Sequence, residues 1–319
     1  MKNFKCIECS KSYLETDVPA NGICDDAACP GQGLTGLLVP DESEQQTTSP
    51  TQIPPSGQGK EVGLCVLLMD ASGSMAEEPY SKSYPSKYPA KPESPIYTIK
   101  EAKLTKREVV TDAAAQAIFG LKNLSKKENA YICAIKFDND PSVMFTKTVA
   151  DILNDYTDVK EFAKYLYDEL SEKNGGTNIN GALNLAYSFV KKFVTGDVPG
   201  MENCIANVQT QYIGTKSKSI DIPNVRIMLY TDGEQLQYYG EIVNPFIANN
   251  DELDLLIGAY IGNPSDNGCK QLEKIISDCP IHNKKQFYVM DAPDKIAALR
   301  GLFRMASGTS GFCPYCIEK

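Results

Sequence analysis

Four runs of apolar residues along the chain predict strands that are buried on both faces. Each run is nearly unbroken and does not alternate with polar residues, which is typical of parallel strands covered by helices above and below. The runs are "VGLCVLLMD" (62–70), "VRIMLYTDGE" (225–234), "LDLLIGAYIG" (253–262) and "QFYVMDA" (286–292). A further segment, "AYICAIKFDNDPSVMFTKTV" (130–149), predicts an antiparallel hairpin around the polar turn "DNDP".

Between these strands, apolar residues recur at helical spacing. Val110, Ala113 and Ala117, for example, fall on one stripe of a helix. The expected helices cover 106–124, 158–170, 178–194, 269–279 and 294–306. Strands that alternate with helices predict an α/β fold, a doubly wound and mostly parallel sheet with helices on both faces.

Polar segments set the expected domain organisation. The divisions are an amino-terminal module (1–37), a linker (38–60), the α/β domain (61–308) and a tail (309–319). The first segment has few large apolar side chains and four cysteines, so burial alone cannot stabilise it. The second is rich in Pro, Ser and Thr, which is typical of a linker. Two stretches inside the domain, near 76–104 and 195–223, are too long for simple connections and are expected to be functional or disordered insertions.

Composition narrows the function classes. The 319 residues carry a formal net charge of −9, which disfavours nucleic acid and anionic lipid as partners. A single histidine, His282, leaves little room for a Ser-His-Asp or Cys-His catalytic group. The start "MKNFKCIECSK" lacks the apolar core of a signal peptide, and no stretch is apolar enough to cross a bilayer. We therefore expect a cytoplasmic protein that does not associate with membranes.

Oxygen-bearing side chains follow three of the predicted elements where ligands bind in open α/β sheets, beyond the carboxyl ends of the strands. Asp70, Ser72 and Ser74 follow the first strand, Thr177 stands in "GGTNINGAL" at the entry to a helix, and Asp232 ends the strand "VRIMLYTD". These hard oxygen donors suit Mg²⁺ or Mn²⁺. The sequence therefore predicts a divalent metal site at this edge of the sheet.

The combination of D-x-S-G-S, a later G-G-T and a strand ending in T-D-G resembles the von Willebrand factor A family, whose fold is shared with integrin I domains. The resemblance covers about residues 61–308 and implies a metal-ion-dependent adhesion site (MIDAS). By this resemblance Ser72 and Ser74 bind the ion directly, Thr177 binds directly or through water, and Asp70 and Asp232 hold coordinated waters. Neutral hydroxyl ligands leave the ion under-neutralised, so an Asp or Glu carboxylate of a partner completes the coordination. Both long insertions are expected to rim this metal.

The amino-terminal cysteines favour a second metal. "FKCIECSKSY" resembles the first knuckle of a zinc ribbon, and Cys6, Cys9, Cys24 and Cys29 together would hold Zn²⁺ in a closed structural site. The gap of four residues in the second pair departs from the usual two. The tail pair "CPYC" (313–316) is a rival for that half of the site.

These features predict a non-enzymatic, intracellular adaptor or regulatory subunit that grips an acidic residue of a protein partner. Cytosolic members of the resembled family work with AAA+ ATPases or with kinase and phosphatase systems, which are therefore the expected partner classes. One alternative is a nucleic-acid-associated zinc-ribbon subunit of a larger complex, although the first 37 residues are not basic. Another is thiol redox chemistry at Cys313 and Cys316, whose motif also matches glutaredoxins but is followed only by "IEK".

Overall fold

The computed structural model defines the arrangement of the α/β domain and part of the amino-terminal module. The described residues are 3–6, 9, 11–14, 16–17, 26, 28, 38–40, 60–77, 105–124, 127–172, 175–195, 197–198, 204–206, 208–213, 218–223, 225–248, 256–278 and 284–290. The expected helix 294–306 and the tail lie outside them, as do His282, Cys24, Cys29, Cys313 and Cys316.

The main sheet is doubly wound and mostly parallel. Its strand order is β12-β11-β10-β4-β5-β6, and every neighbouring pair is parallel except β5 and β6. The strands are β4 (Lys60–Asp70), β5 (Ala130–Phe137), β6 (Ser142–Thr148), β10 (Val225–Thr231), β11 (Leu256–Ile261) and β12 (Phe287–Met290). The strand β4 lies at the centre, where both of its faces are covered, which explains its unbroken apolar sequence. The predicted fold class is confirmed.

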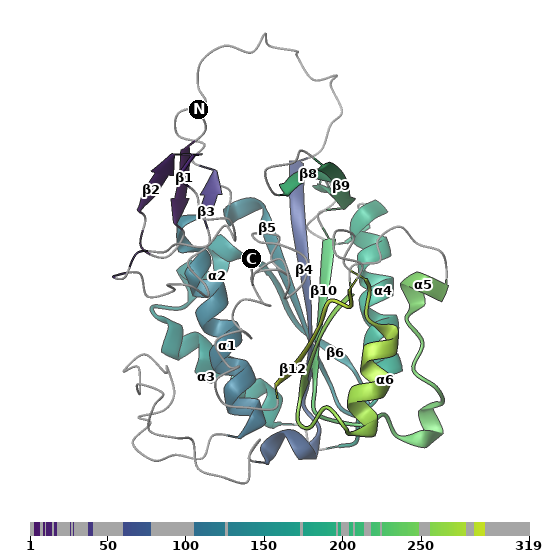
Figure 1. Ribbon diagram of the computed structural model, residues 1–319. Helices are drawn as coiled ribbons and strands as arrows, with labels where there is room; N and C mark the ends of the chain where they lie inside the picture. The colour runs from purple at the N-terminus through teal and green to yellow at the C-terminus, as the bar shows by residue number, and fades with distance from the viewer. Residues whose placement is uncertain are drawn as a thin grey trace.

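Helices cover both faces of the sheet (Figure 1). On one face lie α1 (Lys106–Gly120), α2 (Val149–Asp155) and α3 (Val159–Ser171), and on the other α4 (Ile179–Thr195), α5 (Pro245–Ala248) and α6 (Asn267–Ile275). Short 3-10 turns are η2 (Gly73–Ala76), η3 (Leu121–Asn123), η4 (Lys127–Asn129) and η5 (Gln237–Tyr239). The helix α1 begins at a capping box, in which the Thr105 side chain accepts from the amide of Glu108 and the Glu108 carboxylate accepts from the amide of Thr105.

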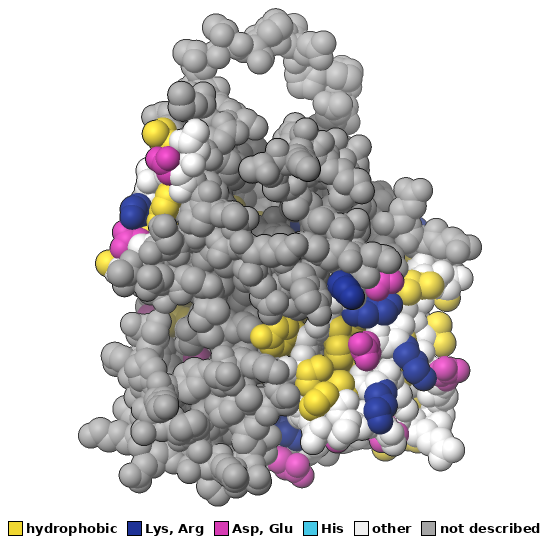
Figure 2. All heavy atoms as spheres, viewed as in Figure 1, with side chains coloured by type: hydrophobic (Ala, Val, Ile, Leu, Met, Phe, Trp, Pro, Cys, Tyr) yellow, Lys and Arg dark blue, Asp and Glu magenta, His cyan; other side chains and the backbone are white. Residues whose placement is uncertain are grey.

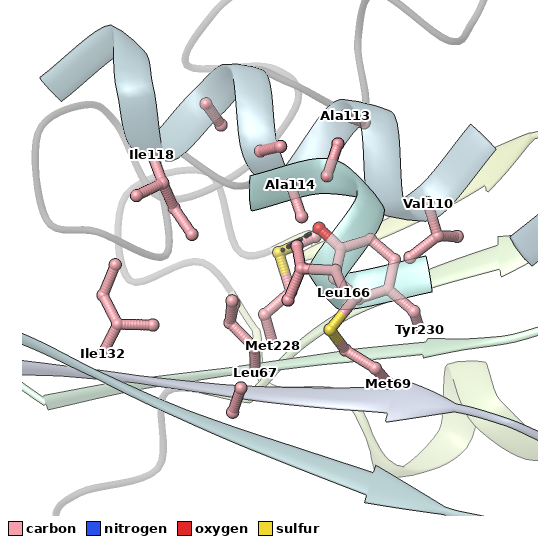
Figure 3. Packing of buried hydrophobic residues seen from close by; sticks show 14 of the residues in the cluster. Leu67, Met69, Val110, Ala113, Ala114, Ile118, Ile132, Leu166, Met228 and Tyr230 are labelled. Carbon is pink, nitrogen blue, oxygen red and sulfur yellow. Dashed lines mark hydrogen bonds between the residues drawn. The ribbon is translucent and has the colours of Figure 1, made fainter. Parts of the chain in front are cut away.

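Small side chains bring α1 close to the sheet. Ala113 and Ala114 are fully buried and face Met69 and Tyr230 on the sheet (Figure 3). The Tyr230 hydroxyl lies 3.0 Å from Sδ of Met228, so this buried polar group has a partner inside the core. Close packing of this kind fixes the position of α1, and with it the position of the residues at its first turn.

The opposite face of the sheet has its own apolar layer. Alternate residues of β4, such as Val66 and Leu68, pack there with Ile179 and Leu183 of α4. The cysteines at 65 and 133 are buried core residues on the two different faces. Burial raises the pKa of both thiols to about 12, so they are unreactive.

The amino-terminal module contains a small antiparallel sheet with the order β2-β1-β3, formed by β1 (Asn3–Cys6), β2 (Ser12–Leu14) and β3 (Leu38–Pro40). The pairing of β3 with β1 brings the first three residues of the segment expected as a linker into this sheet. Cys6 is buried at the end of β1, and Cys9 lies in the turn that follows.

The second insertion lies away from the metal loops, contrary to the expectation. It forms β7 (Cys204–Ala206), which pairs in parallel with the first residues of β4, and a hairpin of β8 (Val208–Ile213) and β9 (Lys218–Pro223). The paired residues Lys60–Val62 stand at the amino end of β4, whereas Asp70 stands at its carboxyl end, about 25 Å away along an extended strand. In Figure 1, β8 and β9 accordingly lie at the upper end of the sheet.

Candidate metal centre

The first loop of the site folds back on the carboxylate that begins it. The Asp70 side chain is fully buried at the end of β4, and its Oδ1 accepts a 2.8 Å hydrogen bond from the amide of Ser72. Its Oδ2 accepts a 2.5 Å hydrogen bond from the hydroxyl of Thr231. Asp70 therefore shapes the loop and joins it to the end of the neighbouring strand β10.

The second loop follows β10, which runs parallel to β4 with Tyr230 opposite Met69. This register brings Asp232 beside the first loop, where Ser74 Oγ donates a 2.8 Å hydrogen bond to Oδ1 of Asp232. The hydroxyls of Ser72 and Ser74 lie 3.1 Å apart. Three of the predicted ligand side chains thus form one continuous row of oxygens.

The third loop carries Thr177, which is buried at the start of α4. The amide of Gly73 donates to the carbonyl of Gly175 at 3.2 Å, which ties this loop to the first one. A Cβ atom on Gly233 would lie 2.6 Å from Thr177 Oγ1. The Thr177 hydroxyl therefore lies against the residue that follows Asp232, and any side chain at that position would force it to move.

A neighbouring turn supports the third loop from outside. The amide of Gly175 donates to the Asp138 carboxylate at 3.2 Å, and the amide of Gly176 donates to Oδ1 of Asn139 at 3.0 Å. The carbonyl of Asp138 accepts from the amide of Asn178 at 2.8 Å. The turn "DNDP" between β5 and β6 is therefore a brace for the loop that carries Thr177, a role that the sequence analysis did not predict.

The spacing of these oxygens fits a small divalent ion. Neighbouring ligands of an octahedral Mg²⁺ lie about 3.0 Å apart, because each is about 2.1 Å from the ion. The Ser72–Ser74 and Ser74–Asp232 separations of 3.1 and 2.8 Å match that edge. Among the described residues, no group of three or more His, Cys, Asp or Glu side chains is placed to hold a metal. The candidate site is not such a group, because it has only two carboxylates and its other donors are hydroxyls.

Two basic residues at the first turn of α1 also belong to the site, and the sequence analysis did not identify them. The ammonium of Lys106 forms an ion pair with Oδ2 of Asp232, and both side chains are largely buried, at 12% and 0% exposure. Arg107 is buried, and its guanidinium lies 3.3 Å from the carbonyl oxygens of Ala71 and Ser72. The sequence signal was the pair "KR" directly after a helix-capping threonine, where the helix dipole disfavours cations.

Burial and repulsion perturb the charges of the site. The pKa of Asp70 is raised to about 7, mainly by burial and next by the nearby Asp232 carboxylate, against the opposing effect of hydrogen bonds from Thr231 and Ser72. Burial lowers the pKa of Arg107. A cation bound between the two carboxylates would offset their repulsion, which adds to burial in raising the pKa of Asp70.

The predicted zinc ligands are only partly described. Cys6 and Cys9 lie near each other in sequence within the small sheet and its turn, and Cys24 and Cys29 fall outside the described residues. The same holds for the rival pair Cys313 and Cys316. The four-cysteine site stays a prediction.

The fold and the site define an α/β domain with a cluster of oxygen-bearing side chains at the carboxyl edge of its parallel sheet. A scan against protein families finds no match, and a search of the curated proteins finds no relative. Within the described residues, no helix has the length and apolar character needed to cross a membrane.

Solved structures share the fold at low similarity. The chain is 13% identical to proximal thread matrix protein 1 from the mussel byssus, with a TM-score of 0.41 over 78% of this chain and 47% of that one. The match thus spans about half the length of that protein, which is also described with a zinc occupied MIDAS motif. BatB from Bacteroides thetaiotaomicron is 15% identical, with a TM-score of 0.41 over 77% of this chain and 99% of that one.

A more distant match is the vWF domain of the type V pili tip protein Mfa5 from Porphyromonas gingivalis. It is 16% identical, with a TM-score of 0.27 over 56% of this chain and 39% of that one. Values this low do not place the chain in a family. The fold class rests on the strand order, strand directions and helix layers described above.

Proposed function

We propose that this chain is a non-enzymatic protein-binding subunit of the von Willebrand factor A type. In this proposal Asp70, Ser72, Ser74, Thr177 and Asp232 hold Mg²⁺ or Mn²⁺, and a partner supplies an Asp or Glu carboxylate as a further ligand. The observation that carries the proposal is the convergence of these side chains from three loops far apart in sequence.

The chemistry of the donors explains why an acidic partner would be recognised. Three of the five groups are neutral hydroxyls, so a bound divalent ion would keep part of its charge. Ser74 is the most accessible of them, being only partly buried, whereas Ser72 and Thr177 are 2% and 5% exposed. An anion from outside would therefore approach on the side of Ser74.

Apolar side chains next to the site suit a protein partner. Leu236 is 41% exposed and lies against Gly176, directly beside Thr177, and its amide donates to the Thr177 carbonyl at 3.3 Å. Tyr238 is 73% exposed, and its ring centroid lies 3.9 Å from that of Tyr239. Exposed leucine and tyrosine side chains beside a polar anchor are typical of protein interfaces.

The remaining parts of the proposal concern the location of the protein, its amino-terminal module and the class of its partner. We place the subunit inside the cell, with a structural zinc module at its amino terminus and an AAA+ ATPase or a kinase or phosphatase system as the class of partner. A nucleic-acid partner is less well supported because the net charge is −9. On the face seen in Figure 2, lysine and acidic side chains are interspersed over the described surface around α6, which is not the pattern of a basic nucleic-acid patch.

Calorimetric titration of the full chain with MgCl₂ or MnCl₂ tests the metal site. We expect saturable uptake by the wild type and a loss of affinity in Ser74→Ala, whereas Ser12→Ala, which alters an exposed serine of β2, should titrate like the wild type. Absence of uptake by the wild type would refute the proposal.

Affinity capture from the native source then tests the partner. One specific protein should be lost both on addition of EDTA and in Ser74→Ala, and it should be retained by Ser12→Ala. Recovery of nucleic acid, or capture that is indifferent to both treatments, would contradict a metal-dependent protein contact.

A further inference from the structure

Lys106 occupies a position that local helix energetics disfavour. It is the first residue of α1, directly after the Thr105 cap, where the positive end of the helix dipole repels a cation. Its side chain is only 12% exposed, although a lysine at a helix start can extend freely into water. A residue that breaks a local rule in this way points to a role elsewhere in the structure, and here its ammonium pairs with the Asp232 carboxylate.

Both carboxyl groups of the site lie near basic side chains even without a metal. Asp70 and Asp232 are the acidic groups, and Lys106 and Arg107 are the basic ones. Arg107 binds backbone carbonyls of the first loop, whereas Lys106 binds a carboxylate that the proposed divalent ion also requires. Two cations crowded onto one buried carboxylate repel each other strongly, because the surroundings screen little of their charge.

We propose that Lys106 is a built-in counter-ion of the site, and that a divalent ion must displace its ammonium from Asp232 in order to bind. This inference rests on the proposed function and adds a residue that sets the affinity of the site. A second acidic group is within reach of the displaced side chain, because the Glu77 carboxylate lies 3.8 Å from Nζ of Lys106. Glu77 is 72% exposed, so an ion pair there forms in water and costs little desolvation.

Lys106 therefore has two acidic neighbours, one buried and one exposed. Without a metal, the ammonium neutralises Asp232, whose side chain is fully buried and would otherwise be a costly unpaired charge. With a metal, the divalent ion takes over that task and Lys106 pairs with Glu77. The apparent affinity for the metal is therefore weaker than the oxygen ligands alone would give, because binding includes breaking a buried ion pair.

Titration of the full chain with MgCl₂ distinguishes two roles of Lys106. A counter-ion competes with Mg²⁺ for Asp232, whereas a structural residue would help to hold the metal ligands in place. We expect Lys106→Met to bind Mg²⁺ about tenfold more tightly than the wild type, a change equivalent to ~1.4 kcal/mol. Lys122→Met makes the same change of net charge at an exposed residue just beyond the far end of α1, and it should bind like the wild type. Lys106→Arg keeps a cation beside Asp232 and should also remain close to the wild type.

Thermal unfolding supplies a second readout. In EDTA, Lys106→Met should unfold at a lower temperature than the wild type because Asp232 loses its partner, and saturating Mg²⁺ should abolish that difference. An affinity in Lys106→Met that is equal to or weaker than that of the wild type would overturn the counter-ion role while leaving the metal site intact. Absence of uptake by both proteins would instead refute the metal site itself, and this inference with it.

Discussion

Ser74 Oγ donates a 2.8 Å hydrogen bond to Oδ1 of Asp232, although 158 positions separate the two residues in the chain. The contact exists because β4 and β10 are neighbouring parallel strands whose carboxyl ends meet at one edge of the sheet. Each residue lies just past the end of its strand. The strand order therefore brings the residues of the site together. Substitutions in the loops, in the residues that brace them and in the core beneath should have distinguishable effects.

The titration of Asp70 should make the metal-free protein less stable as the pH rises. Its pKa is about 7 in the folded state and 3.8 in the unfolded chain, so the fold binds the proton more tightly. Stability is therefore highest below the unfolded value, declines as the pH rises toward the folded value, and is lowered by about 4 kcal/mol above it. Urea unfolding in EDTA at pH 5 and pH 8 measures the part of this loss that falls between these two values, about 3 kcal/mol.

The matched variant for that experiment is Asp70→Asn, which cannot ionise. Between pH 5 and pH 8 the wild type should lose unfolding free energy, whereas the variant should not. The variant should therefore be more stable relative to the wild type at pH 8 than at pH 5. Equal pH dependence of the two proteins would show that Asp70 does not titrate in this range.

Gly233→Ala should damage the site while leaving the fold in place. The new Cβ would lie 2.6 Å from Thr177 Oγ1, so the threonine side chain must move away from residue 233. Overpacking of this kind costs about 1–3 kcal/mol, and we expect a comparable loss in the free energy of Mg²⁺ binding. Calorimetric titration gives the affinity, and circular dichroism checks the fold. Thr177→Val, which removes only the hydroxyl, should lower the affinity too; unchanged binding in both variants would remove Thr177 from the ligand set.

Arg107→Met should loosen the first metal loop. Its buried guanidinium lies 3.3 Å from the carbonyls of Ala71 and Ser72, and hydrogen bonds from a charged donor contribute about 1.5–3 kcal/mol. We expect a loss of stability in that range, together with faster hydrogen exchange at the amides of this loop, including that of Met75. Lys122→Met serves as the control for loss of one positive charge. Faster exchange spread evenly over the domain would argue against a local bracing role.

Enlarging Ala114 should destabilise the whole domain. This residue is fully buried between α1 and the sheet, where Met69 and Tyr230 face it (Figure 3). Ala114→Leu adds volume to a close-packed layer and should cost about 1–3 kcal/mol of unfolding free energy. Lys164→Leu places the same side chain at a position of α3 that is 69% exposed and should change stability by about 0.5 kcal/mol or less. Similar unfolding midpoints for the two variants would show that the helix can move off the sheet without cost.

Much of the fold and of the candidate ligand set could be predicted because both depend on local patterns. Continuous apolar runs marked the buried strands, and the oxygen-bearing residues stood directly after them, as Asp70 and Asp232 do. The contribution of Lys106 was hidden because it is tertiary: its partner is 126 positions away. Nothing in the sequence around a lysine tells whether its ammonium points to water or to a distant carboxylate.

The second insertion was misplaced for a different reason. It follows α4, which starts at the carboxyl edge with Thr177 and leads the chain back toward the amino edge, where β10 begins with Val225 opposite Leu64. The connection rules for parallel sheets predict that a segment between a helix and the next strand lies at the amino edge of the sheet. The sequence analysis instead placed the insertion at the carboxyl edge, because it lies between two metal loops in the sequence. Its strands β8 and β9 pair with each other, so they lack the apolar pattern of the main sheet.

The backbone amide of Lys106 donates a 2.9 Å hydrogen bond to the carbonyl of Glu77, so two residues that flank the segment 78–105 are held together beside the first metal loop. The entropy of closing a loop between two fixed ends grows only slowly with the number of residues in between. The segment between these anchors can therefore be shortened, lengthened or exchanged for an unrelated sequence with little effect on the α/β framework. That makes it a natural position for evolutionary variation beside the first metal loop, and a practical one for grafting a reporter of metal or partner binding.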